Sequence, residues 1–153
     1  MARASFFVSV AGIPLLTATG IPAPSPASAV SPAPGAAARP ADVYDPPWPV
    51  EKFPAQVKKA CAIWKGLGWP KAPRAQDYQV PMSRPLVIRG SNVYRNLSHD
   101  LPTDGAYREY DVNPRRPGQH RDAERIVRDE GAHAVWYTGD HYSNFRKIES
   151  GCE

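Results

Sequence analysis

Proline is spread very unevenly along this chain, and that limits where a compact fold can form. Of 18 prolines, 11 lie at or before Pro54, and the remaining 99 residues hold 7. The excess is therefore local, which excludes a collagen-like or wholly disordered chain. We expect one folded domain at residues 50–153, which is too short for a large multidomain enzyme.

Residues 1–29 have the order of parts found in a secretory signal peptide. Arg3 supplies a positive charge, residues 4–19 are largely apolar, and Ala27–Ala29 offer the small residues that a signal peptidase reads. The apolar run is shorter than the about 20 residues of a spanning helix. We expect a secreted, extracellular protein with no membrane association after cleavage. Residues 36–38 are a second candidate cleavage site, and a disordered leader on a cytosolic protein is the alternative.

Residues 30–49 contain mostly Pro, Ala and Ser, which is typical of an extended, disordered linker. Removing residues 1–29 removes one arginine and no acid, so the formal charge falls from +4 to 18 − 15 = +3. This mild positive charge is compatible with a polyanionic partner but does not require one.

The chain has two cysteines, Cys61 near the start of the expected domain and Cys152 near its end. An even number in an exported chain favours a disulfide bond. Closing a loop of about 90 residues stabilises a small domain by roughly 4–5 kcal/mol on the chain-entropy model. Two unpaired thiols are the alternative.

The residue pattern predicts one helix followed by short strands. Proline at 54 suits the first helical position, Val57, Cys61 and Trp64 recur at helical spacing, and Gly66–Pro70 stop the helix. Turn signals separate the expected strands. These strands are at residues 86–88, 92–97, 106–112, 121–127, 133–137 and 143–148. We therefore expect an α+β domain in which the N-terminal helix packs on an antiparallel sheet of about five strands.

Two of these strands bring charged side chains together. Alternation along a strand places Glu109 and Asp111 on the same face. On the expected strand 121–127, Arg121 and Arg125 share a face about 13 Å apart. Small Ala123 lies between them, so the two arginines would be able to clamp one phosphate.

A tight turn at residues 137–142 would deliver His141 to the rim of the sheet. A carboxylate, two arginines and a histidine suit cleavage of a phosphodiester without a metal. The carboxylate accepts a proton, the histidine donates one to the leaving oxygen, and the arginines stabilise charge on phosphorus. The alternatives are a solvated ion pair at Glu109 and an incidental turn histidine, which are the more common origins of such residues.

Residues from about 93 to 148 resemble a known family. LPT stands at 101–103, YREY at 107–110, and the most specific block, YTGDHY, at 137–142. Arg121 and Arg125 with Ile126 resemble the arginine strand of the same family. In this order the motifs resemble the small secreted microbial ribonucleases, the guanyl-specific enzymes of the barnase and streptomycete type.

The resemblance implies a role for each catalytic residue. Glu109 would be the general base and His141 the general acid. Arg121 and Arg125 would hold the phosphate, and Tyr142 would add a hydroxyl contact. The implied reaction is transesterification of single-stranded RNA to a 2′,3′-cyclic phosphate, followed by slower hydrolysis, with no metal or other cofactor. The implied partners are RNA and a small acidic, barstar-like protein inhibitor, and we expect a monomer.

The sequence departs from the family at the base-binding loop. Asn96, Leu97 and Ser98 lie in the loop that reads guanine, but Leu97 and Ser98 replace the family's arginine–glutamate pair. A carboxylate accepts two charge-assisted hydrogen bonds from guanine, which serine cannot match. Either Asp100 or His99 could substitute from a shifted loop, so guanine preference stays open.

Other departures leave further alternatives. The first arginine follows Glu109 one residue later than the family pattern, and Cys61 lies inside the expected helix rather than before it. An antibacterial ribonuclease toxin and a catalytically inactive nucleic-acid-binding homologue are the other functions to weigh.

Overall fold

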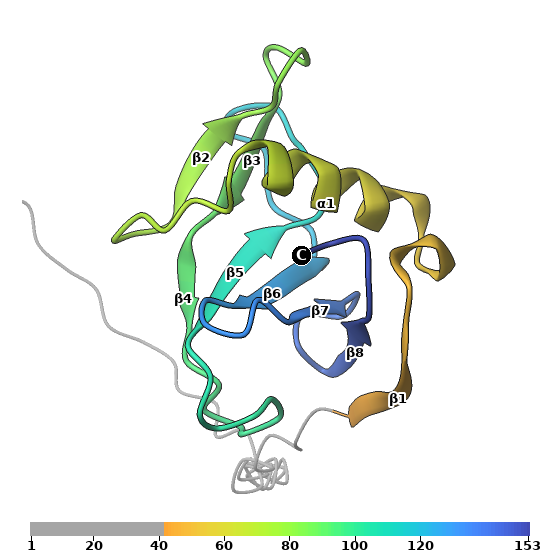
Figure 1. Ribbon diagram of the computed structural model, residues 1–153. Coiled ribbons are helices and arrows are strands. Elements are labelled where there is room, and N and C mark those ends of the chain that lie inside the picture. The colour runs from red at the N-terminus through yellow and green to blue at the C-terminus, as the bar shows by residue number, and fades with distance from the viewer. Residues whose placement is uncertain (1–41) are drawn as a thin grey trace, which may run out of the picture. The chain divides into compact units, whose positions relative to one another are not determined.

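The computed structural model describes residues 42–153, so the predicted signal peptide and residues 30–41 of the predicted linker lie outside it. Figure 1 shows one helix, α1 (Ala55–Gly66), across one face of a sheet, which confirms the predicted α+β class. A short 3-10 helix, η1 (Val50–Lys52), precedes it. The strands are β1 (Asp42–Trp48), β2 (Gln76–Gln79), β3 (Val87–Gly90), β4 (Asn92–Tyr94), β5 (Tyr107–Asp111), β6 (Arg125–Asp129), β7 (Val135–Thr138) and β8 (Asn144–Ile148).

The main sheet has the strand order β1-β8-β7-β6-β5-β4. Its neighbouring strands are antiparallel, except that β1 runs parallel to β8. Strands β2 and β3 form a separate antiparallel pair. Over the described residues the main sheet thus has six strands instead of about five, because β1 adds an edge strand.

The predicted linker therefore ends earlier than residue 49. Residues 42–48 pair with β8, and Trp48 packs against the main core. Proline cannot donate to a sheet ladder, but an edge strand tolerates it. For this reason a proline-rich segment that is typical of a linker can still form β1.

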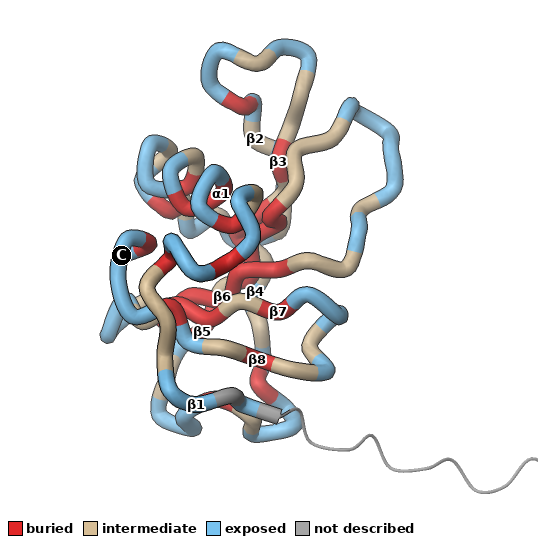
Figure 2. Tube along the Cα trace, turned by 90° about the vertical axis from the view of Figure 1, so that its right-hand side faces the viewer, coloured by how far each residue is buried: buried red, intermediate tan, exposed pale blue. Residues whose placement is uncertain are grey.

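Helix α1 packs on the sheet through the face that its spacing predicts. Pro54 is the N-cap rather than the first helical residue, and its carbonyl accepts the amide of Val57 at 2.9 Å. The indole N–H of Trp64 donates to the backbone carbonyl of Asp111 on β5 at 2.8 Å. In Figure 2 the helix is buried where it faces the sheet and exposed on its outer side. Its buried residues are Val57, Ala60, Cys61 and Trp64.

Close approach of α1 to the sheet requires a glycine on β3. A Cβ at Gly90 would lie 2.6 Å from the ring of Trp64 and 2.6 Å from that of Tyr110. Neither buried ring has room to move, because both belong to the packed core. Gly90 therefore allows the helix to sit directly on the strands that carry the charged cluster.

Two predicted strands differ most from the observed strands. Strand β6 begins at Arg125, because a carboxylate oxygen of Asp122 accepts the amide of Glu124 at 3.0 Å and turns the chain. Strand β4 ends at Tyr94, and Asn96 adopts the left-handed conformation with φ of 48°. The prediction that Arg121 lies on a strand was therefore wrong.

The predicted disulfide is present. Cys61 on α1 bonds Cys152 near the C-terminus, with a sequence separation of 91 and a Cα–Cα distance of 4.9 Å. Both residues are buried in the main core. The bridge therefore closes almost the whole described domain into one covalent loop.

Loss of this bridge should destabilise the domain strongly. Because the loop spans 91 residues, replacing both cysteines by serine is expected to lower the free energy of unfolding by about 4–5 kcal/mol. Urea unfolding of the oxidised wild type, the reduced wild type and the double variant measures this loss. Equal midpoints for the oxidised and reduced wild type would show that the bridge does not form.

Candidate active site

Glu109 lies in the middle of β5, on the sheet face opposite α1, and is 5% exposed. Its carboxylate accepts hydrogen bonds from Arg121 Nη2 at 2.7 Å and from the hydroxyl of Tyr142 at 2.5 Å. The side-chain amide of Asn92, directly opposite on β4, donates a third at 3.1 Å. Donors from three separate segments therefore hold one buried carboxylate in place.

These donors determine the ionisation of Glu109. Burial acts to raise its pKa, but the hydrogen bonds from Arg121, Tyr142 and Asn92 outweigh burial and lower the pKa below its ordinary value. Glu109 is therefore ionised at neutral pH and can accept a proton. Burial and the hydrogen bond to Glu109 in turn raise the pKa of Tyr142.

Asp111 is a member of this site to which the sequence pattern assigned no role. Its carboxylate is buried and accepts Arg121 Nε at 2.9 Å, while Arg125 Nε lies 3.5 Å away. Burial raises the pKa of Asp111, Arg121 and Arg125 oppose the rise, and the charge of Glu109 adds to it. The only sequence signal was its position two residues after Glu109 on the same face.

Arg121 and Arg125 contact the same two carboxylates, although Arg121 lies in a loop and Arg125 on a strand. Arg121 comes from the loop before β6, and its side chain remains 29% exposed. Arg125, at the start of β6, is 3% exposed, and its Nε lies 3.7 Å from Glu109. The two guanidinium groups converge on Glu109 and Asp111, instead of standing apart along one strand. This corrects the predicted clamp geometry while keeping both arginines at the site.

The turn between β7 and β8 presents His141 and Tyr142. Both have left-handed backbones, with φ of 56° and 74°, which non-glycine residues adopt only under constraint. The Thr138 hydroxyl accepts the Tyr142 amide at 3.0 Å, and the Asp140 carboxylate accepts the Thr138 hydroxyl at 2.9 Å. The His141 amide donates to Ala123 at 3.1 Å, so the turn is bound to the arginine loop.

His141 is exposed, and its ring centroid lies 4.7 Å from that of Tyr142. Because the Tyr142 hydroxyl binds Glu109, the histidine is one side chain away from the buried carboxylate. This arrangement places a solvent-facing imidazole near a buried carboxylate.

A cavity of about 480 Å³ borders this cluster and is lined by residues 94–98 and Tyr142. Asn96 shapes the loop from within, since its amide donates to the carbonyl of Leu101 at 2.7 Å and accepts the amide of Leu101 at 3.0 Å. Leu97 is 80% exposed. The Ser98 hydroxyl donates to the carboxylate of Asp100, which is thus one hydrogen bond away from the lining.

The structure thus brings together the predicted residues Glu109, Arg121, Arg125 and Tyr142 in direct contact, with His141 beside them. Of the predicted base-site residues, Leu97 and Ser98 line the neighbouring cavity. The side chain of Asn96 also borders it, but its polar atoms are used within the loop.

Neither a membrane-spanning helix nor a group of metal-ligating side chains is found in the part of the chain that the structure describes. No helix of residues 42–153 has the length and apolar character needed to cross a membrane. These residues also contain no group of three or more His, Cys, Asp or Glu side chains that could hold a metal ion.

Comparison with known proteins points to the ribonucleases. The model of the ribonuclease family matches residues 37–149. The chain is also similar to a guanyl-specific ribonuclease, ribonuclease Sa of Kitasatospora aureofaciens, with 40% identity over 81 residues. That alignment covers 51% of this chain and 77% of the relative.

The hydrogen bond from Tyr142 should be visible in the titration of Glu109. Tyr142→Phe removes a donor to the ionised carboxylate, so we expect the pKa of Glu109 to rise toward its ordinary value. Carbon-13 NMR of the Glu109 carboxyl measures this. Tyr94→Phe is the matched control, because the Tyr94 hydroxyl bonds Ser98 instead.

The lowered pKa of Glu109 also makes the stability of the fold depend on pH. Because folding lowers the pKa of Glu109, its ionisation stabilises the fold above the ordinary carboxyl pKa, and this contribution disappears as the pH falls through the lowered value. In Tyr142→Phe this contribution should be smaller, and its loss should be complete at a higher pH, because the folded-state pKa lies closer to the ordinary value. An unchanged Glu109 titration in this variant would contradict the proposed hydrogen bond.

Proposed function

Because this chain belongs to the ribonuclease family and is an endoribonuclease, we propose that it cleaves single-stranded RNA by acid–base catalysis at Glu109 and His141. The observation that carries the proposal is the buried Glu109 carboxylate, kept ionised by Arg121 and Tyr142. A buried, ionised carboxylate beside two arginines has the character of a general base.

The proposed reaction is the one that the family resemblance implies, with these groups in the acid and base roles. Glu109 takes the proton of the ribose 2′-hydroxyl, whose oxygen bonds phosphorus. His141 gives a proton to the 5′-oxygen, whose bond to phosphorus breaks. The products are a 2′,3′-cyclic phosphate and a free 5′-hydroxyl. Water then opens the cyclic phosphate with the two roles exchanged, which leaves a 3′-phosphate.

The arginines would stabilise the charge that grows on the phosphate oxygens. Arg121 and Tyr142, which bind Glu109 in the structure, would turn their N–H and O–H groups toward the phosphate when RNA binds. Asp111 would keep Arg121 in position during this change. These residues supply base, acid and charge stabilisation, so the proposed step uses no metal ion.

Secretion is part of the same proposal. It is supported by the Cys61–Cys152 disulfide, which is typical of proteins from oxidising compartments. A small acidic, barstar-like protein could inhibit the enzyme by placing a carboxylate against Arg121, whose side chain remains partly exposed.

Removal of either proposed acid–base group should abolish most of the activity. Glu109→Gln and His141→Ala are each expected to lower the rate of RNA cleavage by about 10²–10⁴-fold. Initial rates on a defined RNA in EDTA measure the loss. Glu149→Gln and His133→Ala are matched controls, because both residues are exposed and lie away from the cluster.

The outcome also separates the alternatives. Full activity in both site variants, with native unfolding midpoints, would overturn the assigned roles. RNA binding without turnover by the wild type would identify an inactive homologue.

We expect this enzyme to prefer cleavage after guanine less strongly than the name of its guanyl-specific relative suggests. We place the base on the 5′ side of the cleaved bond in the cavity lined by residues 94–98. No carboxylate is among the residues that line this cavity, and the carboxylate of Asp100 already accepts the Ser98 hydroxyl. Ser98→Glu should therefore raise the preference for cleavage after guanine by about 10–100-fold, through hydrogen bonds to a charged acceptor.

Cut-site mapping on an RNA that contains all four bases measures this preference. His99→Glu is the matched control, since it adds the same charge one residue outside the cavity lining. Strong guanine preference in the wild type would show that the loop reads guanine without a carboxylate in the lining.

A further inference from the structure

The hydrogen-bond donors to Glu109 approach it from two sides of β5. Strands β4 and β6 flank β5, so Asn92 on β4 approaches from one side and Arg121, in the loop before β6, from the other. Tyr142 reaches the carboxylate from the turn between β7 and β8. In the proposed reaction Arg121 and Tyr142 turn toward the phosphate when RNA binds. Asn92 is then the donor that stays with the carboxylate.

The donors also divide between the two oxygens of the Glu109 carboxylate. Oε1 accepts Arg121 Nη2 at 2.7 Å. Oε2 accepts both the Tyr142 hydroxyl, at 2.5 Å, and the Asn92 amide, at 3.1 Å. Arg125 Nε lies 3.7 Å from Oε1, which is too far for a hydrogen bond. Release of Arg121 therefore frees Oε1 to take a proton, while Asn92 still holds Oε2.

The backbone just before Asn92 is held in an unusual conformation. Ser91 is fully buried and has a left-handed backbone with φ of 68°. Its hydroxyl donates to the carbonyl of Pro70 at 2.6 Å and bonds the Tyr78 hydroxyl at 2.6 Å, and its carbonyl accepts Arg108 Nη1 at 2.8 Å. A strained residue that is fixed by several contacts indicates a functional constraint nearby. Here the constraint fixes the start of β4, from which Asn92 reaches the carboxylate.

We infer that Asn92 is a positioning residue that holds the Glu109 carboxylate while Oε1 takes the proton of the ribose 2′-hydroxyl. The inference rests on the proposed function, in which Glu109 is the general base. Asn92 acts through Glu109 rather than on the RNA, because its amide keeps Oε2 bonded and so fixes the direction of Oε1. An amide suits this task because it donates a hydrogen bond without ionising.

Other ionisable groups also face Glu109 and contribute to its titration. They come from the strands on both sides of β5, from β5 itself and from the two loops, and they are Tyr94, Asp111, Arg121, Arg125, Tyr142 and, beside Tyr142, His141. All of them remain when Asn92 alone is replaced. A difference between such a variant and the wild type therefore reports the amide.

Asn92→Leu removes the donor and keeps a similar side-chain volume. Rates of cleavage of a defined RNA in EDTA by the full, oxidised chain are measured across the acid range of pH. The acid limb of the kcat profile reports the base in the enzyme–substrate complex. We expect this limb to move up by about one pH unit, because the ionised carboxylate loses a donor. On the plateau, kcat should fall about tenfold with KM little changed, because the carboxylate is no longer oriented.

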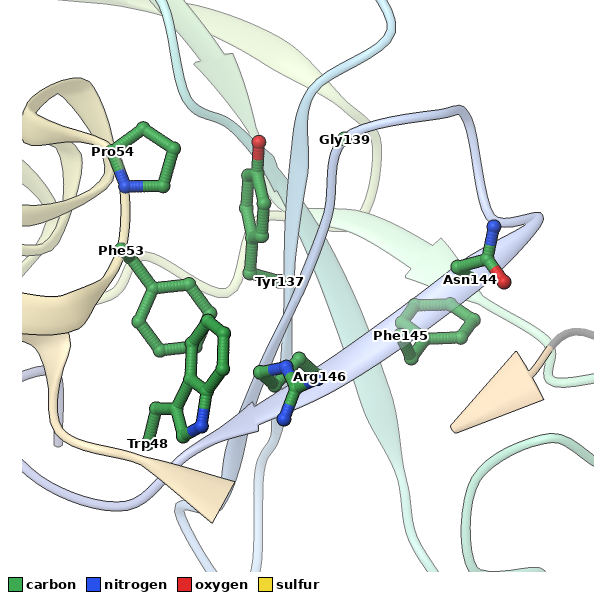
Figure 3. A pocket seen from close by; sticks show the side chains of 8 residues that line it. All are labelled: Trp48, Phe53, Pro54, Tyr137, Gly139, Asn144, Phe145 and Arg146. Atoms are coloured by element: carbon green, nitrogen blue, oxygen red, sulfur yellow. The ribbon is translucent and has the colours of Figure 1, made fainter. Parts of the chain in front are cut away.

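Two variants are matched controls that should keep the wild-type profiles. Tyr137→Phe also removes a donor to a glutamate, since the Tyr137 hydroxyl bonds Glu124 at 2.5 Å. Figure 3 shows this tyrosine in a cavity beside Phe53 at the start of α1, on the sheet face opposite Glu109. Val93→Ala changes the next residue of β4, whose side chain is 52% exposed.

Thermal melts show which variants are folded, and Asn92→Ala decides the test if Asn92→Leu does not fold. A kcat profile whose acid limb stays at the wild-type pH would overturn the inference, even if the kcat/KM profile moved, because Asn92 would then act only before RNA binds. Failure of the wild type to cleave RNA, or full activity of Glu109→Gln, would instead refute the proposed function.

Discussion

The buried ion cluster of Glu109, Asp111, Arg121 and Arg125 is the interaction on which the rest of this structure depends. Two carboxylates and two guanidinium groups face each other at the centre of the sheet, so the cluster is close to neutral. Removing one member of a buried ion pair costs about 3–5 kcal/mol, because the remaining charge is uncompensated. The loop before β6 must therefore fold back until Arg121 reaches the carboxylates, which keeps Arg121 outside the strand.

Asp111 connects this charged face to the hydrophobic face on the other side of the sheet. Its carboxylate binds Arg121, while its backbone carbonyl accepts the indole N–H of Trp64 on α1. The helix can approach so closely only because Gly90 leaves room for the Trp64 ring. Packing of α1 therefore determines the position of β5, and β5 determines the position of Glu109. The residues that stabilise the core and those proposed for catalysis are consequently not independent.

Local patterns in the sequence predicted the parts of this arrangement that have a fixed period. Helical spacing identified the buried face of α1, and alternation placed Glu109 and Asp111 together on β5. The position of Arg121 was missed because it depends on contacts with carboxylates rather than on strand period. Strand β1 was missed because its proline-rich sequence resembles a linker, and only pairing with β8, distant in sequence, makes it a strand. Long-range pairing of this kind leaves no local signal.

The residues proposed for catalysis and the loop proposed for base recognition are held in place by different interactions. One of the two can therefore change in sequence without the other. Glu109 and Arg125 are fixed by strand register and buried contacts, where a substitution disturbs the whole cluster. The loop that we propose for base binding instead contains two hydrogen bonds between the side chain of Asn96 and the backbone of Leu101, neither of which involves residues 97 and 98. The exposed side chain of Leu97 can therefore vary at little cost to the loop, and a change at Ser98 removes only its hydroxyl contact with Asp100 and leaves the two Asn96 bonds in place. A chain that resembles the family at the proposed catalytic residues but differs from it at Leu97 and Ser98 agrees with this difference in support.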